Sequence, residues 1–385
     1  MQVVETEYDV AFIGGGLAGL AGAIQCAKAG FKVVLVEKEK YPFHKVCGEY
    51  ISMESFDFLS ALGVPLAEMS LPQITSLQIT APNGKEFMTK LPLGGFGISR
   101  YKLDAMLAQI ARDSGVAMLE ETKASDIIKH EVEYTIKISS KLLNINQIGT
   151  KVICCSYGKR SNLDIKWKRN FINKNDPGIN NYVGVKYHIR TDWPTHLIGL
   201  HNFKDGYCGI SKIEDENYCL CYLTKANNLK ASNNSIQEMQ QNILFQNPVL
   251  KKIFASSDFL FQTPVTISQI SFSKKSLVEN GALMLGDAAG MITPLCGNGM
   301  SMALHSSKMA TSAIKDFLSG SCSKRQMEET YRRQWKKEFE SRMHTGRILQ
   351  GFFGSPLRSN LFVSAFKAMP FLSQSIIKKT HGKPF

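Results

Sequence analysis

A glycine-rich turn between an apolar segment and a helical segment, near the start of the chain, constrains the fold more than any other feature. The run Gly14-Gly15-Gly16-Leu17-Ala18-Gly19 fits the pattern GxGxxG. The apolar segment 8–13 precedes the turn, and a segment with apolar residues at helical spacing follows it and ends at Gly30. The β-branched segment 31–36 comes next. This strand-helix-strand unit predicts a Rossmann-like α/β domain that binds a dinucleotide.

The glycines of this turn have separate physical tasks. Gly14 permits the tight turn, Gly16 lets the backbone approach a pyrophosphate, and Gly19 allows close contact of helix and strand. The start of the helix attracts the phosphate charge. Glu37, at the end of the second apolar segment, can accept hydrogen bonds from ribose hydroxyls and would repel the 2′-phosphate of NADP, so FAD or NAD fits better. The predicted binding residues of this unit are Gly14, Gly16, Leu17, Ala18, Gly19, Glu37 and Lys38.

A second motif lies some 270 residues further along the chain. Gly286-Asp287-Ala288-Ala289-Gly290 follows a buried-strand pattern and leads to Pro294-Leu295-Cys296-Gly297-Asn298-Gly299 and a helical segment. This arrangement resembles the second flavin motif of the p-hydroxybenzoate-hydroxylase-like (class A) flavoprotein monooxygenases and the related geranylgeranyl reductases. The resemblance implies that the cofactor is FAD, that Asp287 holds its ribityl chain, and that the turn 294–299 lies along its isoalloxazine ring. Amides at the following helix start would stabilise the reduced ring.

Two shorter segments strengthen the resemblance. Arg100, at the start of a helical segment, is similar to the family arginine that reaches the FAD phosphate or ribityl region. The segment 45–49, with the sequence Lys-Val-Cys-Gly-Glu, resembles one that lies near the flavin in the reductases, in halogenase-like proteins and in several tailoring monooxygenases. Its Cys47 is a candidate for redox chemistry or a space-filling thiol. These motifs add further expected FAD contacts, namely Lys45, Cys47, Gly48, Arg100, Gly286, Asp287, Pro294, Gly297, Asn298 and Gly299.

The resemblance predicts a glutathione-reductase-like FAD-binding domain, built from separated segments, with an inserted antiparallel β-sheet that forms a substrate domain and a C-terminal helical region. Short alternating segments broken by turn residues support the inserted sheet. The expected boundaries are 1–73, 98–165 and 272–320 for the FAD-binding domain, 74–97 and 166–271 for the substrate domain, and 321–385 for the helical region.

The sequence also differs in several positions from the flavoprotein families that it resembles. Class A hydroxylases carry Ala-Asp-Gly before Arg-Ser, linked to both FAD and NAD(P)H, and here Tyr157 replaces the aspartate. No second GxGxxG is present, so we expect electrons from transiently bound NAD(P)H or from a partner reductase. The Trp-x-Trp-x-Ile-Pro signature of flavin halogenases and the aromatic-Trp-x-Phe-Pro stretch of geranylgeranyl reductases are both absent. The run Tyr207-Cys208-Gly209 in the similar place looks more like tailoring monooxygenases.

Catalytic side chains are harder to assign. His188, His196 and His201 are candidates for a general base by location only. Each fits a surface or structural histidine as well, so we assign no general base. Tyr207 is a second catalytic candidate beside Cys47, as a residue that lines the pocket. The nine cysteines form no paired CxxC, so we expect no metal site and mostly reduced thiols in a cytoplasmic protein.

The C-terminal region carries much of the net charge of +13, with thirteen basic and four acidic residues between 321 and 385. Apolar residues alternate with these cations. The pattern fits an interfacial helix in peripheral contact with an anionic membrane, or a packed helical subdomain with a solvated basic face. Nucleic acid is not expected as a partner, because no recognised binding module accompanies the charge.

Three functions are consistent with these observations. The leading hypothesis is a monooxygenase that hydroxylates an aromatic or polyketide-type substrate, with or without a lipid tail, through a flavin C4a-hydroperoxide, as the resemblance implies. The alternative is geranylgeranyl-reductase-like saturation of a prenyl or polyene chain, which the segment 45–49 and the basic apolar tail favour. The third is a degenerate flavin-binding electron carrier, which the replacement at Tyr157 favours. In the first two, the partner is a small hydrophobic or aromatic substrate.

Overall fold

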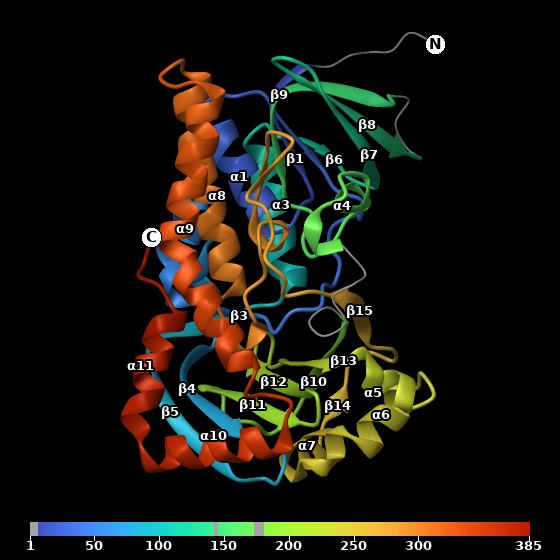
Figure 1. Ribbon diagram of the computed structural model, residues 1–385, viewed down its shortest axis with the longest axis vertical. Coiled ribbons are helices and arrows are strands. Elements are labelled where there is room, and N and C mark those ends of the chain that lie inside the picture. The colour runs from blue at the N-terminus through green and yellow to red at the C-terminus, as the bar shows by residue number, and fades with distance from the viewer. Residues whose placement is uncertain (1–6, 142–144, 173–180) are drawn as a thin grey trace.

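The computed structural model describes residues 7–141, 145–172 and 181–385, and it consists of two sheets placed one above the other along the long axis of the molecule (Figure 1). Among the described residues, eight strands form the first sheet. Five of them are parallel to their neighbours, and the other three add an antiparallel edge strand and a hairpin. In order across the sheet they are β16 (Val278–Glu279), β17 (Ala282–Met284), β9 (Gln147–Cys155), β1 (Glu7–Ile13), β2 (Val33–Val36) and β6 (Ala117–Leu119), with β7 (Thr122–Lys129) and β8 (Tyr134–Ser140) joined to β9.

The first sheet confirms the predicted Rossmann-like unit. Strand β2 is apolar and buried throughout, as is β1 from Val10 onward, which is typical of strands covered on both faces. Val10 pairs with Val33 on one side and Val152 on the other. Helix α1 (Leu17–Lys28) follows β1 directly and packs against α3 (Arg100–Asp113) and α8 (Gly299–Leu318). The side chain of Ser99 caps α3 by accepting a hydrogen bond from the backbone amide of Lys102.

Nine strands of the described residues form the second sheet. It was predicted to be antiparallel, and one pair is an exception: β4 and β11 run parallel. Those two strands lie more than 100 residues apart in the chain, so no tight hairpin dictates their relative direction. The strands are β3 (Tyr50–Ser52), β4 (Gln73–Thr80), β5 (Glu86–Gly97), β10 (Tyr182–Arg190), β11 (Leu197–Phe203), β12 (Gly206–Lys212), β13 (Tyr218–Lys225), β14 (Asp258–Phe259) and β15 (Val265–Ile270).

The two faces of the second sheet differ in their partners. One face carries Val185, Ile189 and Tyr222 and packs against three short helices to form a separate apolar core. Because side chains alternate along a strand, Lys186 and His188 of β10 point to the opposite face, toward the first domain. The helices behind the sheet are α5 (Ala226–Ala231), α6 (Ile236–Asn242) and α7 (Pro248–Ala255). Strand β3 belongs to this sheet, so the second sheet begins at residue 50, within the range expected for the first domain.

Three C-terminal helices complete the fold. Helix α9 (Lys324–Gln350) runs beside α8 toward the second sheet, and α10 (Pro356–Ala368) and α11 (Pro370–Thr380) pack against β5 (Figure 1). In the described parts of the chain, no helix combines the length and the apolar character that a membrane span requires. The remaining elements are α2 (Phe56–Leu62), α4 (Asn162–Lys166) and the 3₁₀ turns η1 (Met53–Ser55), η2 (Leu66–Glu68), η3 (Asn170–Ile172), η4 (Leu244–Gln246), η5 (Gly286–Ala288) and η6 (Pro294–Cys296).

Candidate FAD and substrate sites

The glycine-rich turn has the geometry that its spacing predicted. Gly14 has a φ of +103°, and a side chain there would come within 2.5 Å of the backbone of Tyr157. A side chain at Gly19 would come within 2.1 Å of the carbonyl oxygen of Gly14. Gly16 differs, because a Cβ on it would meet nothing closer than 3.8 Å. The turn is therefore tightly packed behind Gly14 and Gly19 and open in front of Gly16, where the helix start has no side-chain cap.

Two cations lie over this open side of the turn. The guanidinium of Arg100 approaches the position that a Cβ of Gly16 would occupy, and the ammonium of Lys45 lies 3.3 Å from the carbonyl oxygen of Gly15. Asp104 holds both, at 2.7 Å from Arg100 and 2.9 Å from Lys45. Burial would raise the pKa of Asp104, but the two cations outweigh it and lower that pKa. One buried carboxylate thus fixes two positive charges at the start of α1, where a phosphate would bind.

Glu37 closes the other side of the turn. Its carboxylate is buried and accepts hydrogen bonds from the backbone amides of Gly15, at 2.8 Å, and Glu39, at 3.1 Å. An ionised carboxylate has about four acceptor positions, so two are left for ribose hydroxyls. Tyr41 donates a hydrogen bond of 2.5 Å to the Gly15 carbonyl oxygen and shapes the same turn. Lys38 is exposed and pairs with Glu39, away from these contacts.

The second motif meets the first in space. A Cβ on Gly286 would lie 3.4 Å from that of Ala18 in the first turn of α1. Asp287 lies in η5 and lines a small cavity with residues of α8. The buried ammonium of Lys275 donates to the carbonyl oxygen of Asp287 at 2.8 Å and holds this turn in place. Two segments separated by most of the chain therefore flank one site.

The turn from Pro294 to Gly299 leads from this site to the second sheet. The backbone of Gly297 is in the left-handed region, with a φ of +62°. A Cβ on this glycine would lie 3.2 Å from the ring of Tyr50 on β3. Asn298 is buried and donates from its side chain to the backbone of Thr380 at 2.8 Å, so it anchors the C-terminal segment. Gly299 begins α8. Among the residues of this turn that were predicted to contact FAD, Asn298 uses its side chain for a bond within the protein. The others lie between the first domain and β3.

A model of the family described as "FAD binding domain" matches residues 7–340. The chain belongs to the FAD-binding domain family. Conditioned medium factor receptor 1 of Dictyostelium discoideum is 25% identical over 329 residues, 80% of this chain and 64% of that protein. Digeranylgeranylglycerophospholipid reductase of Methanococcus vannielii is 23% identical over 377 residues, 88% of this chain and 84% of that protein. A solved flavin-dependent brominase shares the fold with a TM-score of 0.79 at 18% identity, covering 97% of this chain and 93% of its own.

The described residues fit FAD. The space in front of Gly16 would admit a pyrophosphate, and the start of α1 with Arg100 and Lys45 would neutralise its charge. Glu37 would hold the adenosine ribose at the end of β2. The meeting of Ala18 with Gly286 brings Asp287 to the position from which it would hold the ribityl chain. The predicted residues on these segments lie around one site, with the exception of Lys38.

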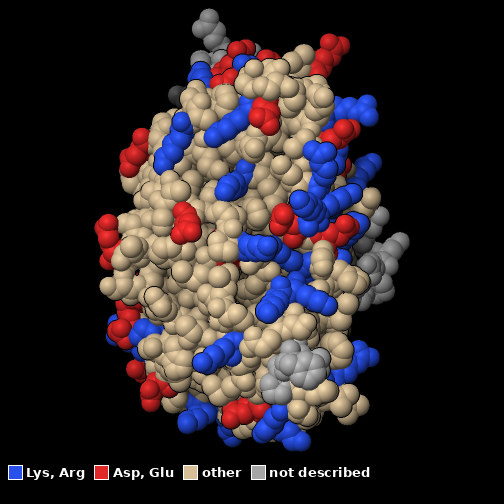
Figure 2. Space-filling model, turned by 90° about the vertical axis from the view of Figure 1, so that its left-hand side faces the viewer, with Lys and Arg blue, Asp and Glu red and all other residues tan. Residues whose placement is uncertain are grey.

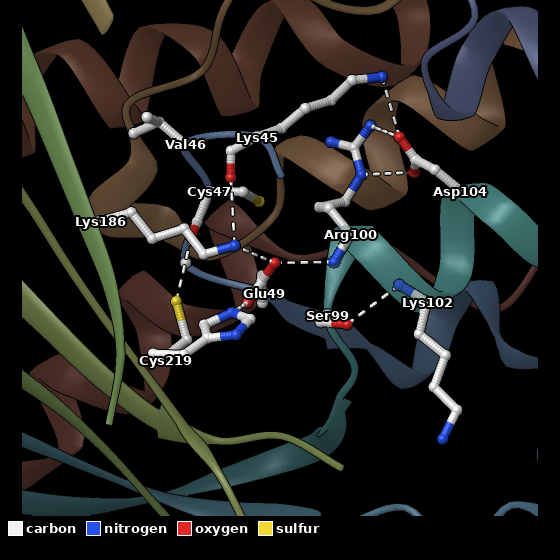
Figure 3. A network of polar contacts seen from close by, with 12 residues as sticks. Lys45, Val46, Cys47, Glu49, Ser99, Arg100, Lys102, Asp104, Lys186 and Cys219 are labelled. Atoms are coloured by element: carbon white, nitrogen blue, oxygen red, sulfur yellow. Dashed lines mark hydrogen bonds and ion pairs between the residues drawn. The ribbon is translucent and has the colours of Figure 1, made fainter. Parts of the chain in front are cut away.

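The segment that contains Cys47 is tied to the second sheet by a buried ionic network (Figure 3). Glu49 accepts from the ammonium of Lys186 at 2.5 Å and lies 2.6 Å from His188, and none of the three is substantially exposed. Its carboxylate also accepts from the backbone amide of Arg100 at 2.7 Å. Burial would raise the pKa of Glu49, but Lys186 and His188 lower it below its usual range. Glu49 has a φ of +55°, an uncommon conformation for a non-glycine residue, which these contacts maintain.

The same network holds Cys47 through its backbone. The carbonyl oxygen of Cys47 accepts from the thiol of Cys219 on β13 at 3.1 Å, and that of Gly48 accepts from Ser211 on β12 at 3.1 Å. Glu49, His188 and Cys219 also form a group of metal-ligand types that the chain spacing did not reveal. Because Lys186 already pairs with this carboxylate and would repel a cation, we interpret the group as an ion-pair network.

The remaining catalytic candidates have different positions. His201 is buried against Thr80, and burial lowers its pKa to about 3, so it has a structural role. His196 is exposed at the start of β11. Tyr207 is buried on β12 against the ring of Phe353, and burial holds its pKa well above the usual value. Only His188 lies beside the segment 45–49.

Tyr157, which replaces the hydroxylase aspartate, is bound to a different carboxylate. Its hydroxyl donates to Asp164 at 2.5 Å, and Arg169 contacts the same carboxylate at 2.8 Å. Arg169 also donates to the carbonyl oxygen of Ala288 in the second motif at 3.0 Å. This buried group therefore supports the cofactor site from behind.

An apolar pocket of about 80 Å³ adjoins the turn of the second motif. Its walls come from the second sheet, from the turn 294–297 and from the C-terminal helices, and they contain no carboxylate and no lysine or arginine. Tyr50 lies where these walls meet. The other lining side chains include Leu77, Ile79, Phe87, Ile198, Leu200, Leu295, Cys296, Phe353, Phe362, Phe366, Ile376 and Ile377. A larger, more polar cleft beside β5 shares Tyr50, Leu91, Ile377 and His381 with this pocket.

Sequence reasoning missed several residues of these sites. Asp104 could have been found, because an acid four residues after Arg100 on a helix is a recognisable pair. Lys186 and Lys275 gave no such signal, since Lys186 donates to the carbonyl oxygen of Lys45 and Lys275 to that of Lys159, both more than 100 residues away. Tyr50 gave none because the pocket that it lines is built from distant segments.

The structure predicts a pH effect at Lys275. Burial lowers the pKa of this lysine to about 8, so below that pH the folded chain holds an unfavourable charge. Between about pH 8 and 10.5 the unfolded chain binds the extra proton, and stability must rise with pH. We expect Lys275→Met to be more stable relative to wild type at pH 7, by up to about 3 kcal/mol, than at pH 10. Urea unfolding at both values tests this. Lys274→Met, at an exposed neighbour, is the control, and an equal pH response in both variants would contradict the assignment.

Proposed function

We propose that the chain is a FAD-dependent oxidoreductase whose substrate is an apolar, chain-like molecule bound between the second sheet and the C-terminal helices. The main observation that supports this proposal is the apolar pocket beside the turn of the second flavin motif. Aliphatic and aromatic side chains line it, so it suits a hydrocarbon chain better than a charged or strongly polar ring.

Saturation of a carbon–carbon double bond is the reaction that these residues support best. Such a reduction adds one hydride and one proton across the double bond. Reduced FAD, when bound, supplies the hydride. The proton requires a donor that stays protonated in an apolar pocket, and Tyr50 meets this requirement. Its hydroxyl is buried without a hydrogen-bond partner among the described residues, and burial raises its pKa well above the usual value.

Tyr50→Phe should therefore lower turnover about a hundredfold to ten-thousandfold, the usual contribution of a positioned acid. FAD content and thermal stability should change little, because the lost hydroxyl makes no hydrogen bond to the described residues. Single-turnover reoxidation of the reduced holoprotein by a polyprenyl alcohol measures the effect. Thr89→Val, in the same pocket, controls for altered pocket shape. Wild-type turnover in Tyr50→Phe would remove Tyr50 as the donor.

Hydroxylation is the second candidate, and the same tyrosine supports it, because its free hydroxyl could receive a phenol. Oxygen separates the two reactions. A reductase consumes its substrate anaerobically after chemical reduction of the flavin, whereas a hydroxylase needs oxygen and incorporates its label. Geranylgeraniol and 4-hydroxybenzoate are suitable probes, each with and without oxygen. If neither probe nor their lipid-tailed analogues alter flavin reoxidation, the electron-carrier hypothesis replaces both.

The electron donor remains part of the proposal. Transiently bound NAD(P)H and a partner reductase are the two sources, and stopped-flow reduction of the oxidised holoprotein by NADH and NADPH distinguishes them. Fast reduction by either nucleotide supports direct use. Reduction only after addition of a reductase supports a partner.

A further inference from the structure

Helix α10 exposes large apolar side chains. Leu357 and Leu361 are 80% and 69% exposed, and they lie four residues apart, on one side of the helix. Ile348, Phe352 and Met369, at neighbouring positions, are 52%, 39% and 43% exposed. Single exposed apolar residues are normal on a protein surface, but a group on adjacent elements marks a contact site.

The opposite side of α10 is already packed. Val363 and Phe366 are buried, and Phe366 contacts the ring of Phe87 on β5 at 5.7 Å between centroids. The helix is therefore apolar on both sides, with one side on the protein core and the other in solvent. A helix that is apolar all round normally has both sides covered.

The charge of this part of the chain indicates what kind of surface binds the exposed side of α10. Exposed basic residues occur throughout this part of the chain, and no acidic residue occurs in the sequence from 346 onward. Figure 2, which views the molecule from the left of Figure 1, shows many Lys and Arg along one side of that face, with Asp and Glu among them, and a largely uncharged area beside them. The exposed basic residues of this stretch are Arg347, Arg358, Lys367, Lys378, Lys379 and Lys383.

We propose that this face, defined by Ile348, Phe352, Leu357, Leu361 and Met369, docks on an anionic lipid surface with the help of the exposed cations of the same part of the chain. Leucines would enter the acyl boundary while lysines and arginines contact the headgroups. A second copy of the chain fits less well, because a two-fold contact would place these cations against one another. The inner side of the same helices forms walls of the apolar pocket, but the docking assignment holds whether or not the proposed reaction is correct.

Vesicle co-sedimentation of the FAD-loaded full chain tests this inference. We expect binding to vesicles of phosphatidylglycerol and phosphatidylcholine at low salt, weaker binding at high salt, and little binding to phosphatidylcholine alone. Leu357→Glu/Leu361→Glu should weaken binding at least about tenfold, because two apolar side chains lose their burial and gain repelled charges. Leu357→Ser/Leu361→Ser should weaken it as well and guards against a folding defect in the first variant.

Val132→Glu is the matched control, since Val132 is 67% exposed in the loop between β7 and β8, at the opposite end of the molecule (Figure 1). It should bind like wild type. The inference is overturned if wild type does not bind anionic vesicles, or if both leucine variants bind as tightly as wild type. A wild-type dimer that the leucine variants convert to a monomer, with no vesicle binding, would assign the face to a second copy instead.

Discussion

Gly16→Ala should weaken FAD binding on the order of a hundredfold, roughly 2.8 kcal/mol, while the chain remains folded. The reason is the open side of the glycine-rich turn. A Cβ at residue 16 meets no protein atom closer than 3.8 Å, and the backbone there has an ordinary negative φ. The protein therefore tolerates the methyl group, and only a ligand that approaches the turn would be displaced by it. Fluorescence titration of the deflavinated protein with FAD measures the loss.

Two other glycines make this experiment specific. Gly149→Ala, on β9, also adds a methyl group with nothing closer than 3.8 Å, and it should bind FAD normally. Gly14→Ala should instead destabilise the fold, because its φ is +103° and its Cβ would overlap the backbone at Tyr157. If Gly16→Ala binds FAD as tightly as Gly149→Ala does, the pyrophosphate does not lie where we place it.

The fold and the cofactor site were predictable because their signals are local. A turn with Gly14, Gly16 and Gly19 must be close-packed on one side and open on the other, and its strand and helix adjoin it in the chain. The second motif is likewise a short run whose residue types imply its geometry. Their meeting, at Ala18 and Gly286, followed from the family resemblance and is confirmed by the structure.

The substrate side was less predictable because its contacts are remote in the chain. Glu49 and Lys186 lie 137 residues apart, and nothing in either local sequence marks a partner. The pocket takes walls from β4, β11 and helices near residue 370, so its apolar character appears only once these segments are assembled. The sequence of the C-terminal region allowed two predictions, a packed helical subdomain or an interfacial helix. An amphipathic pattern does not distinguish an apolar side that packs on the protein from one that binds a membrane. Helix α10 has apolar residues on both sides.

Glu49→Gln should destabilise the fold by about 3–5 kcal/mol, because it leaves the ammonium of Lys186 buried without its counter-charge. Glu49→Gln/Lys186→Met removes both charges and should recover most of this loss, since methionine fills similar space. Asp205→Asn is the matched control: its pair with Lys225 is 2.7 Å long but exposed, and its loss should cost less than about 1 kcal/mol. Denaturant unfolding of wild type, Glu49→Gln, Lys186→Met and the double variant gives the coupling free energy of the pair.

The pH dependence of these unfolding free energies provides an independent test of the same network. The pKa of Glu49 is lowered in the folded chain, so its stabilising contribution is present above the unfolded pKa, near 4.3, and is lost as pH falls through the folded value. The stability gap between wild type and Glu49→Gln should therefore be full at pH 7 and shrink only in acid below about pH 4. A gap that is small at pH 7, or that does not change in acid, would show that the Lys186 pair does not hold the segment with Cys47. The position of this segment would then depend on its other hydrogen bonds, which include those from Cys219 and Ser211.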